Sequence, residues 1–289
     1  MPTLTIPSRY CGPTNSVNGG YACGSIAAFA DGPVIVKLRQ PPPLNTPMTV
    51  EQAADGSLRV RHDGTLIAEA TPSPNQPGQP NQPGQPGQPN QPGLPLPSPL
   101  SMAKIQAVAS RARYFEDPYF PNCFVCGIDR QPGDGLRIFP GPLTDRPDRP
   151  DRPDRPERPD RPERPDQPIW AAPWPPDPSV AGPDGTVRTE VIWAALDCPS
   201  GIAAGEGSDL GQDTAIVLGQ MTASLPVLPV PGDQCQVIAW PAGRDGRKLT
   251  AGSALLGPRG EVLATARAVW ITVPRPVHPV HPVPAASAD

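Results

Sequence analysis

The sequence contains almost no histidine: His62, His278 and His281 are the only three in 289 residues. A Ser-His or Cys-His catalytic unit therefore has little to draw on, because the first lies at a predicted hairpin turn and the other two in a Pro-rich tail. The chain also lacks G-x-S-x-G, G-x-G-x-x-G after a strand, and G-x-x-x-x-G-K-[ST]. These absences argue against a serine hydrolase, a dinucleotide-dependent enzyme and a nucleotide hydrolase, and no cofactor is expected.

Long hydrophobic runs and a strong charge of one sign are absent as well. No segment reaches the roughly 18 uninterrupted apolar residues of a membrane helix, and the first residues lack the basic and apolar regions of a secretory signal. Lys and Arg number 24 against 28 Asp and Glu, for a formal charge of -4. We therefore expect a cytoplasmic protein with no nucleic-acid or membrane partner, whose six cysteines stay reduced.

Proline and glycine are abundant instead, with 48 and 28 residues. Two tracts carry a Pro in nearly every unit of three, an arrangement that disfavours both helix and sheet. We predict a Pro/Gln/Gly-rich linker at 73–99, a disordered Asp-Arg-Pro insertion at 144–168 and a disordered tail at 274–289. A scaffold role, in which these tracts recruit partner proteins, stays open.

The remaining segments, 1–72 and 100–273, repeat the same order of parts. Each has a small-residue helix, then a strand-like run that breaks at a proline cluster, then a hairpin with a glycine in its turn. The first helix is expected from about Gly19 to Ala30, and the hairpin turns lie at Gly64 and Gly260. This order predicts an internal duplication, in which a helix lying on an antiparallel sheet is made twice.

The motif "NGGYACG", the helix "WAALDCPSGIAA" and the order of strands after each helix resemble the tandem (double) hotdog proteins of the acyl-CoA thioesterase type. The resemblance implies an α+β fold with two copies of a long helix wrapped by a curved antiparallel sheet, the first half at 1–72 and the second at 100–273. It implies hydrolysis of an acyl thioester carried by CoA or an acyl carrier protein. The alternative is a non-catalytic acyl-CoA-binding protein, and homo-oligomer formation stays open.

The glycine pair before the first helix is the first candidate site. A helix N-terminus has unpaired N–H groups and partial positive charge, so it can stabilise an oxyanion, and glycine lets a carbonyl approach closely. The resemblance implies that the amides of Gly20 or Tyr21 form the oxyanion hole, with Asn18 and Gly19 contacting the substrate. In the alternative, Asn18 caps the helix and the glycines only pack.

Asp197 is the second candidate, since related thioesterases carry a carboxylate part-way along the helix as general base or nucleophile. The competing explanation makes Asp197 an N-cap, because Pro199 is well tolerated in a first helical turn. The halves complement each other: Ala28 falls near the carboxylate position of the first half, and Glu190 stands where the second would need glycine. One departure is that Trp270 occupies the expected place of a catalytic Gln.

The only C-x-x-C, Cys123 to Cys126, supplies half of a tetrahedral zinc site. Completing it with Cys11 and Cys23 is the less favoured alternative to packing thiols in a turn that leads into a strand "GLRIF", so no metal is expected. Arg130 in the same loop is a candidate for binding phosphates of a CoA-like ligand, because a guanidinium binds phosphate in bidentate fashion.

Overall fold

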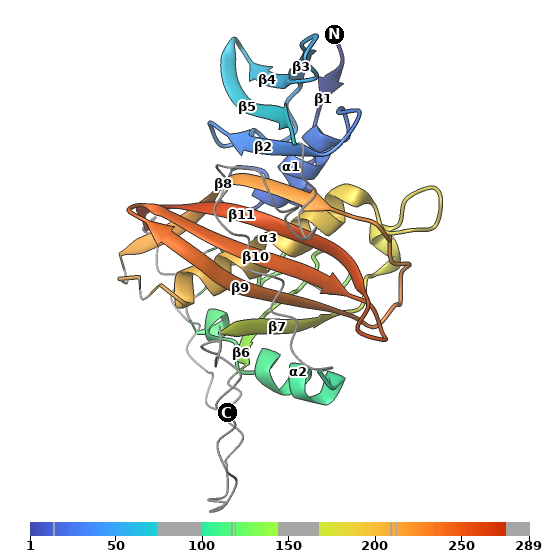
Figure 1. Cartoon of the computed structure of the whole chain (residues 1–289), viewed down its shortest axis with the longest axis vertical. Coiled ribbons are helices and arrows are strands. Elements are labelled where there is room, and N and C mark those ends of the chain that lie inside the picture. Colours follow the sequence, from blue (N-terminus) through green and yellow to red (C-terminus); the bar gives the residue numbers. More distant parts are fainter. Residues whose placement is uncertain are drawn as a thin grey trace, which may run out of the picture.

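The computed structural model describes residues 1–13, 15–73, 100–116, 118, 120–143, 168–208, 210–211 and 213–275. The predicted Pro-rich linker, Asp-Arg-Pro insertion and tail fall almost entirely outside these residues. The described chain combines three α-helices with one large antiparallel sheet, and so confirms an α+β fold (Figure 1).

The sheet has eleven strands in the described part of the chain, in the order β1-β3-β4-β5-β2-β8-β11-β10-β9-β7-β6. The strands are β1 Thr3–Leu4, β2 Val34–Leu38, β3 Met48–Gln52, β4 Leu58–His62, β5 Thr65–Pro72, β6 Gly141–Leu143, β7 Ile169–Trp174, β8 Thr214–Ser224, β9 Cys235–Asp245, β10 Lys248–Leu256 and β11 Val262–Pro274. Strands β2 and β8 join the N-terminal and C-terminal groups through the pairs Val36↔Met221 and Lys37↔Gln220.

The strand order is the same when read outward from this junction. On one side the sequence of strands is β2, β5, β4, β3, β1, and on the other it is β8, β11, β10, β9, β7, so each group runs first, fourth, third, second. Both predicted hairpins form, and both predicted turn glycines have positive φ, 77° at Gly64 and 81° at Gly260. Asp63 also has positive φ, which matches the twist of a two-residue β-hairpin.

The entry to each long helix is built in the same way. Before the first helix, the Asn18 amide donates to the Tyr10 carbonyl, and before the other, the Arg188 amide donates to the Val180 carbonyl. A β-bridge precedes each pair, Cys11↔Val17 in one case and Ala181↔Val187 in the other. All these positions differ by 170 residues, so Asp197 corresponds to Ala27. The sequence-based alignment with Ala28 is therefore displaced by one residue.

Two helices lie against one face of the sheet. Helix α1 (Gly19–Ala27) contacts β2 and β8, and helix α3 (Thr189–Glu206) contacts β8 to β11, crossing behind them in Figure 1. Small residues let the two helices approach closely: a Cβ at Gly20 would lie 2.7 Å from the Trp193 carbonyl oxygen. The alternative that the glycines pack against the partner helix is thus correct for Gly20.

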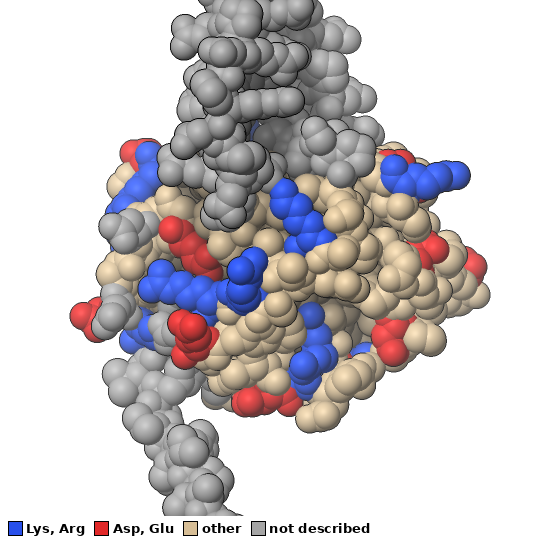
Figure 2. Space-filling model, turned by 90° about the horizontal axis from the view of Figure 1, so that it is seen from below, with Lys and Arg blue, Asp and Glu red and all other residues tan. Residues whose placement is uncertain are grey.

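The remaining helix and the tryptophans complete the core. Helix α2 (Met102–Ala109) covers β6 and β7 at the C-terminal edge of the sheet. All five tryptophans are buried, as their predicted packing role requires. None of the described helices has the length and apolar character to span a bilayer. Figure 2 shows the face at the lower end of Figure 1, where basic and acidic side chains are interspersed among uncharged ones.

The predicted strand "GLRIF" does not form. Its backbone makes two ladder-like bonds, from the Leu136 amide to the Phe124 carbonyl and from the Ile138 amide to the Val125 carbonyl. Arg137 between them has a φ of 55°, outside the extended region, so the segment turns instead of continuing as a strand.

Candidate functional site

The N-terminus of α1 meets the middle of α3 at Asp197. The Gly20 amide donates to Asp197 Oδ2 at 2.9 Å, and Asn18 Nδ2 donates to the same oxygen at 3.1 Å. The side chain is 1% exposed. A carboxylate from one half of the chain therefore lies directly against the glycine pair of the other half.

The N-cap explanation for Asp197 is wrong. Helix α3 begins at Thr189 with Arg188 as its N-cap, so Asp197 lies in the third turn and Pro199 is inside the helix. Pro199 has no N–H for the Ala195 carbonyl, and two hydroxyls assist the backbone nearby. Ser253 donates to the Leu196 carbonyl at 2.8 Å and Ser200 to the Asp197 carbonyl at 2.7 Å.

One oxygen of Asp197 is unsatisfied. Oδ1 has no hydrogen-bond partner among the described residues, although it is buried. Burial raises the pKa of the Asp197 carboxyl to about 7, against the opposing effect of the bonds from Gly20 and Asn18. A buried carboxyl with a free oxygen has the acceptor capacity that a general base or a nucleophile needs.

A cavity of about 380 Å³ adjoins the carboxylate, within the range of small-molecule sites. Its wall includes Asn18 and Gly19 from the start of α1, Asp197 and Cys198 from α3, and Trp270 from β11. The predicted contacts Asn18 and Gly19 and the predicted base therefore lie on one cavity. Trp270 packs over Gly201 and donates from Nε1 to Ser200 Oγ at 3.0 Å.

The two predicted oxyanion donors already have acceptors inside the protein. The Gly20 amide donates to Asp197, and the Tyr21 amide donates to Asn18 Oδ1 at 2.9 Å, which makes Asn18 the N-cap of α1. The Tyr21 ring is stacked on Tyr10 and does not line the cavity. The Gly19 amide, in contrast, has no acceptor among the described residues.

The structure does not bring Arg130 to the cavity. Its guanidinium donates to the Asn122 and Arg9 carbonyls, to Asp134 Oδ2 at 2.7 Å and to Cys11 Sγ at 3.0 Å. The side chain is only 13% exposed. These bonds hold the loop after the C-x-x-C in place and leave Arg130 little capacity for a phosphate.

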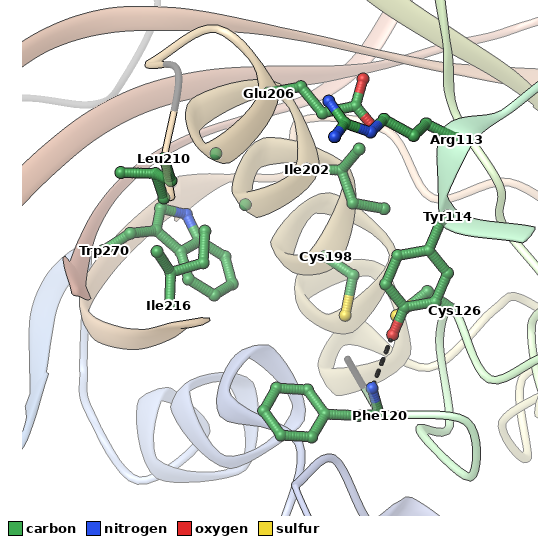
Figure 3. Close-up of a pocket in the computed structure, with 12 residues that line it drawn as sticks. Arg113, Tyr114, Phe120, Cys126, Cys198, Ile202, Glu206, Leu210, Ile216 and Trp270 are labelled. Carbon is green, nitrogen blue, oxygen red and sulfur yellow. Dashed lines mark hydrogen bonds between the residues drawn. The ribbon is translucent and has the colours of Figure 1, made fainter. Parts of the chain in front are cut away.

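A smaller cavity of about 130 Å³ lies on the other side of Cys198 (Figure 3). It shares Phe120, Cys198, Ile216 and Trp270 with the larger cavity, so the two adjoin. Glu206 lies at one end, where it accepts from Trp170 Nε1, and burial raises its carboxyl pKa. This second cavity gave no signal in the sequence, because its walls come from segments far apart in the chain.

Three thiols converge between the cavities. Cys123 and Cys126 come from the loop between α2 and β6, and Cys198 comes from α3; their sulfur atoms all lie within 4.8 Å of one another. Hydrogen bonds from the thiols of Cys126 and Cys198 lower the pKa of Cys123. The sequence reasoning missed Cys198, since nothing in its spacing from the C-x-x-C indicates the contact.

Comparisons with known proteins give matches among solved structures alone. No family model matches the chain, and no curated protein matches it. The similar structures include a thioesterase from Haemophilus influenzae (14% identity, TM-score 0.34, covering 38% of this chain and 75% of that one). They also include the E. coli PaaI protein from the phenylacetic acid degradation operon (10%, 0.33, 36% and 72%). A Streptococcus mutans protein bound to acetyl CoA is similar as well (10%, 0.33, 37% and 82%). TM-scores this low do not by themselves assign a fold or a function.

Proposed function

We propose that the chain is a double hotdog protein that hydrolyses an acyl thioester, with the acyl group in the 380 Å³ cavity. The observation that carries the proposal is the buried Asp197 carboxylate, which lies at the cavity wall against the first turn of α1 and keeps one oxygen free. The matching strand orders and helix entries support a duplication into halves at 1–72 and 100–273.

In the proposed reaction, Asp197 takes a proton from a water molecule as the water oxygen attacks the thioester carbonyl. The carbonyl oxygen gains negative charge and is placed at the N-terminus of α1, where the helix dipole favours it. When the C–S bond breaks, the proton passes to the departing sulfur, so water and thioester become acid and thiol.

The amides of the first turn divide the work in this proposal. We assign the carbonyl oxygen to the Gly19 N–H, which has no acceptor among the described residues and lies on the cavity. The Gly20 N–H orients Asp197 and is shared with the oxyanion only if the carboxylate shifts. Tyr21 acts through its bond to Asn18, and we leave Arg130 out of the substrate contacts.

Thiol release from a panel of short to long acyl-CoAs tests the proposal. We expect turnover at one or more chain lengths and a loss of about 10²- to 10⁴-fold in kcat for Asp197→Asn, the range for a missing general base. Glu190→Gln is the matched control, because this carboxylate on the same helix does not line the cavity and should change kcat little. Absence of turnover at every length, or a fully active Asp197→Asn, would refute hydrolysis.

A non-catalytic acyl-CoA-binding protein is the second candidate. The observation that favours it is that both predicted oxyanion amides, Gly20 and Tyr21, already donate inside the protein. Calorimetry separates the two: saturable acyl-CoA binding without thiol release selects the binding protein. Thermal unfolding of Asp197→Asn, run in parallel, shows whether a loss of turnover reflects a loss of fold.

A further inference from the structure

The three-thiol cluster of Cys123, Cys126 and Cys198 has no part in the proposed hydrolysis. Cys123 and Cys126 are buried, and Cys198 is half-buried at the boundary of the two cavities. Cys198 lies 75 residues from Cys123 in the chain, so the contact depends on the loop folding back onto α3. Cysteine that only fills space does not require three sulfur atoms from two segments to meet.

The spacing of the sulfur atoms fits a tetrahedral cation. At a Zn–S length of about 2.3 Å, tetrahedral geometry separates two ligating sulfurs by about 3.8 Å. The Cys123 and Cys198 sulfurs are 3.6 Å apart, and the third sulfur lies within 4.8 Å of both. A shift of less than about 1 Å would bring all three to the separation that one ion requires.

The surroundings supply donors suited to ligated thiolates. Asn18 Nδ2 lies 3.5 Å from the Cys198 sulfur and 3.8 Å from the Cys123 sulfur, in donor geometry to both. Amide donors to ligand sulfur are the kind of outer contact that orients metal ligands. Asn18 would thus connect the thiol cluster to Asp197, to which it also donates.

A fourth position is open toward the cavities. Within the described part of the chain, no His, Asp or Glu joins the three sulfurs as a possible ligand. Cys198 lines both cavities, Cys126 the smaller and Cys123 the larger, so water or a ligand can reach the cluster. Three protein ligands with one open position is the arrangement of a zinc site that keeps an exchangeable ligand.

We propose that Cys123, Cys126 and Cys198 bind one soft divalent cation of the zinc class, with an exchangeable fourth ligand from the cavity side. The sequence alone predicts no metal, because the C-x-x-C supplies two ligands. Cys11 and Cys23, the partners considered from sequence, are not members of the cluster, and Cys198 takes the third place. The bound ion would fix the loop of Cys123 to α3.

Cobalt(II) titration of the reduced full-length protein is the primary test. We expect a thiolate-to-cobalt charge-transfer band that saturates at one equivalent, with the visible bands of tetrahedral cobalt, and that disappears when zinc is added. Cys198→Ser should abolish the band, whereas Cys235→Ser should keep it, because Cys235 is buried in β9 outside the cluster. No saturable band in the wild type, or an unchanged band in Cys198→Ser, would overturn the proposal.

A measurement on the wild type covers the case in which Cys198→Ser does not fold. The native protein is treated with a thiol alkylating reagent with and without zinc, and modified cysteines are located by mass spectrometry. Zinc should slow modification of Cys123, Cys126 and Cys198 and leave Cys11 unaffected. Equal rates with and without zinc contradict the site, and so does a disulfide among these three in protein isolated without reductant, which would indicate a redox pair.

Discussion

Replacing Gly20 by alanine tests the close approach of α1 and α3 on which the site depends. An added Cβ would lie 2.4 Å from the Asp197 Cβ, 2.7 Å from the Trp193 oxygen and 3.0 Å from the Ala194 Cα. Carbon atoms in contact prefer about 3.5–4.0 Å. None of the three contacts is the end of a flexible side chain, so the helices must separate by roughly 1 Å to reach that range.

The size of the effect follows from that separation. Overpacking of this kind costs about 1–3 kcal/mol. A shift of roughly 1 Å takes the 2.9 Å bond between Gly20 and Asp197 beyond hydrogen-bond range, which costs about 1–3 kcal/mol for a buried polar group. Alanine returns about 1 kcal/mol through its helix propensity. We expect the free energy of unfolding to fall by about 3 kcal/mol, within a range of about 1–5.

Urea unfolding and thermal melts followed by circular dichroism measure the change in Gly20→Ala. For a chain of this size the expected drop in Tm is about 6–12 °C. Gly205→Ala is the matched control on α3, because its Cβ would make ordinary contacts of 3.6 and 3.9 Å and should shift stability by less than about 1 kcal/mol. If the two variants have equal stability, the close contact at Gly20 does not exist as described.

Two further predictions concern Asn18 and Glu206. Asn18→Ala removes the cap of α1 and a donor to Asp197, so the free energy of unfolding should fall by about 2–3 kcal/mol in urea titrations, and Asn18→Ser should recover about 1 kcal/mol by restoring a capping oxygen; equal losses would show that the cap contributes nothing. Burial raises the pKa of Glu206, so its contribution to stability is greatest below the ordinary carboxyl pKa of about 4.3 and is lost as pH rises through the folded pKa. Glu206→Gln should therefore gain in Tm relative to wild type on going from mildly acidic to neutral pH, and a pH-independent difference would contradict this.

Local signals predicted the elements and their ends well. The expected start of α1 at Gly19 is correct because Asn18 has the side chain that caps a helix. The proline clusters separate β2 from β3 and β8 from β9 as expected, since proline cannot donate in a sheet ladder. The turn glycines are correct because only their positive φ fits these turns. Each of these features is decided by a few neighbouring residues.

Contacts between distant segments account for what the sequence did not show. Pro199 favoured a helix start at Asp197, but packing of α3 across β8 to β11 carries the helix through the proline. Cys198 joins Cys123 only because the loop before β6 returns to α3. Strands β6 and β7 were not predicted, and the Arg130 guanidinium turned out to be bonded within its own loop. None of these contacts has a local pattern to reveal it.

The two halves differ at the positions that matter for the proposed site, and packing explains why one site per chain is expected. The position that holds Gly20 in the first half holds Glu190 in the second, where the side chain is 23% exposed and lies 3.6 Å from Arg188. The position of Asp197 corresponds to Ala27, which has no carboxylate. A carboxylate can lie under the first turn of a facing helix only where that turn has no side chain, and this chain meets both requirements once, at Gly20 and Asp197.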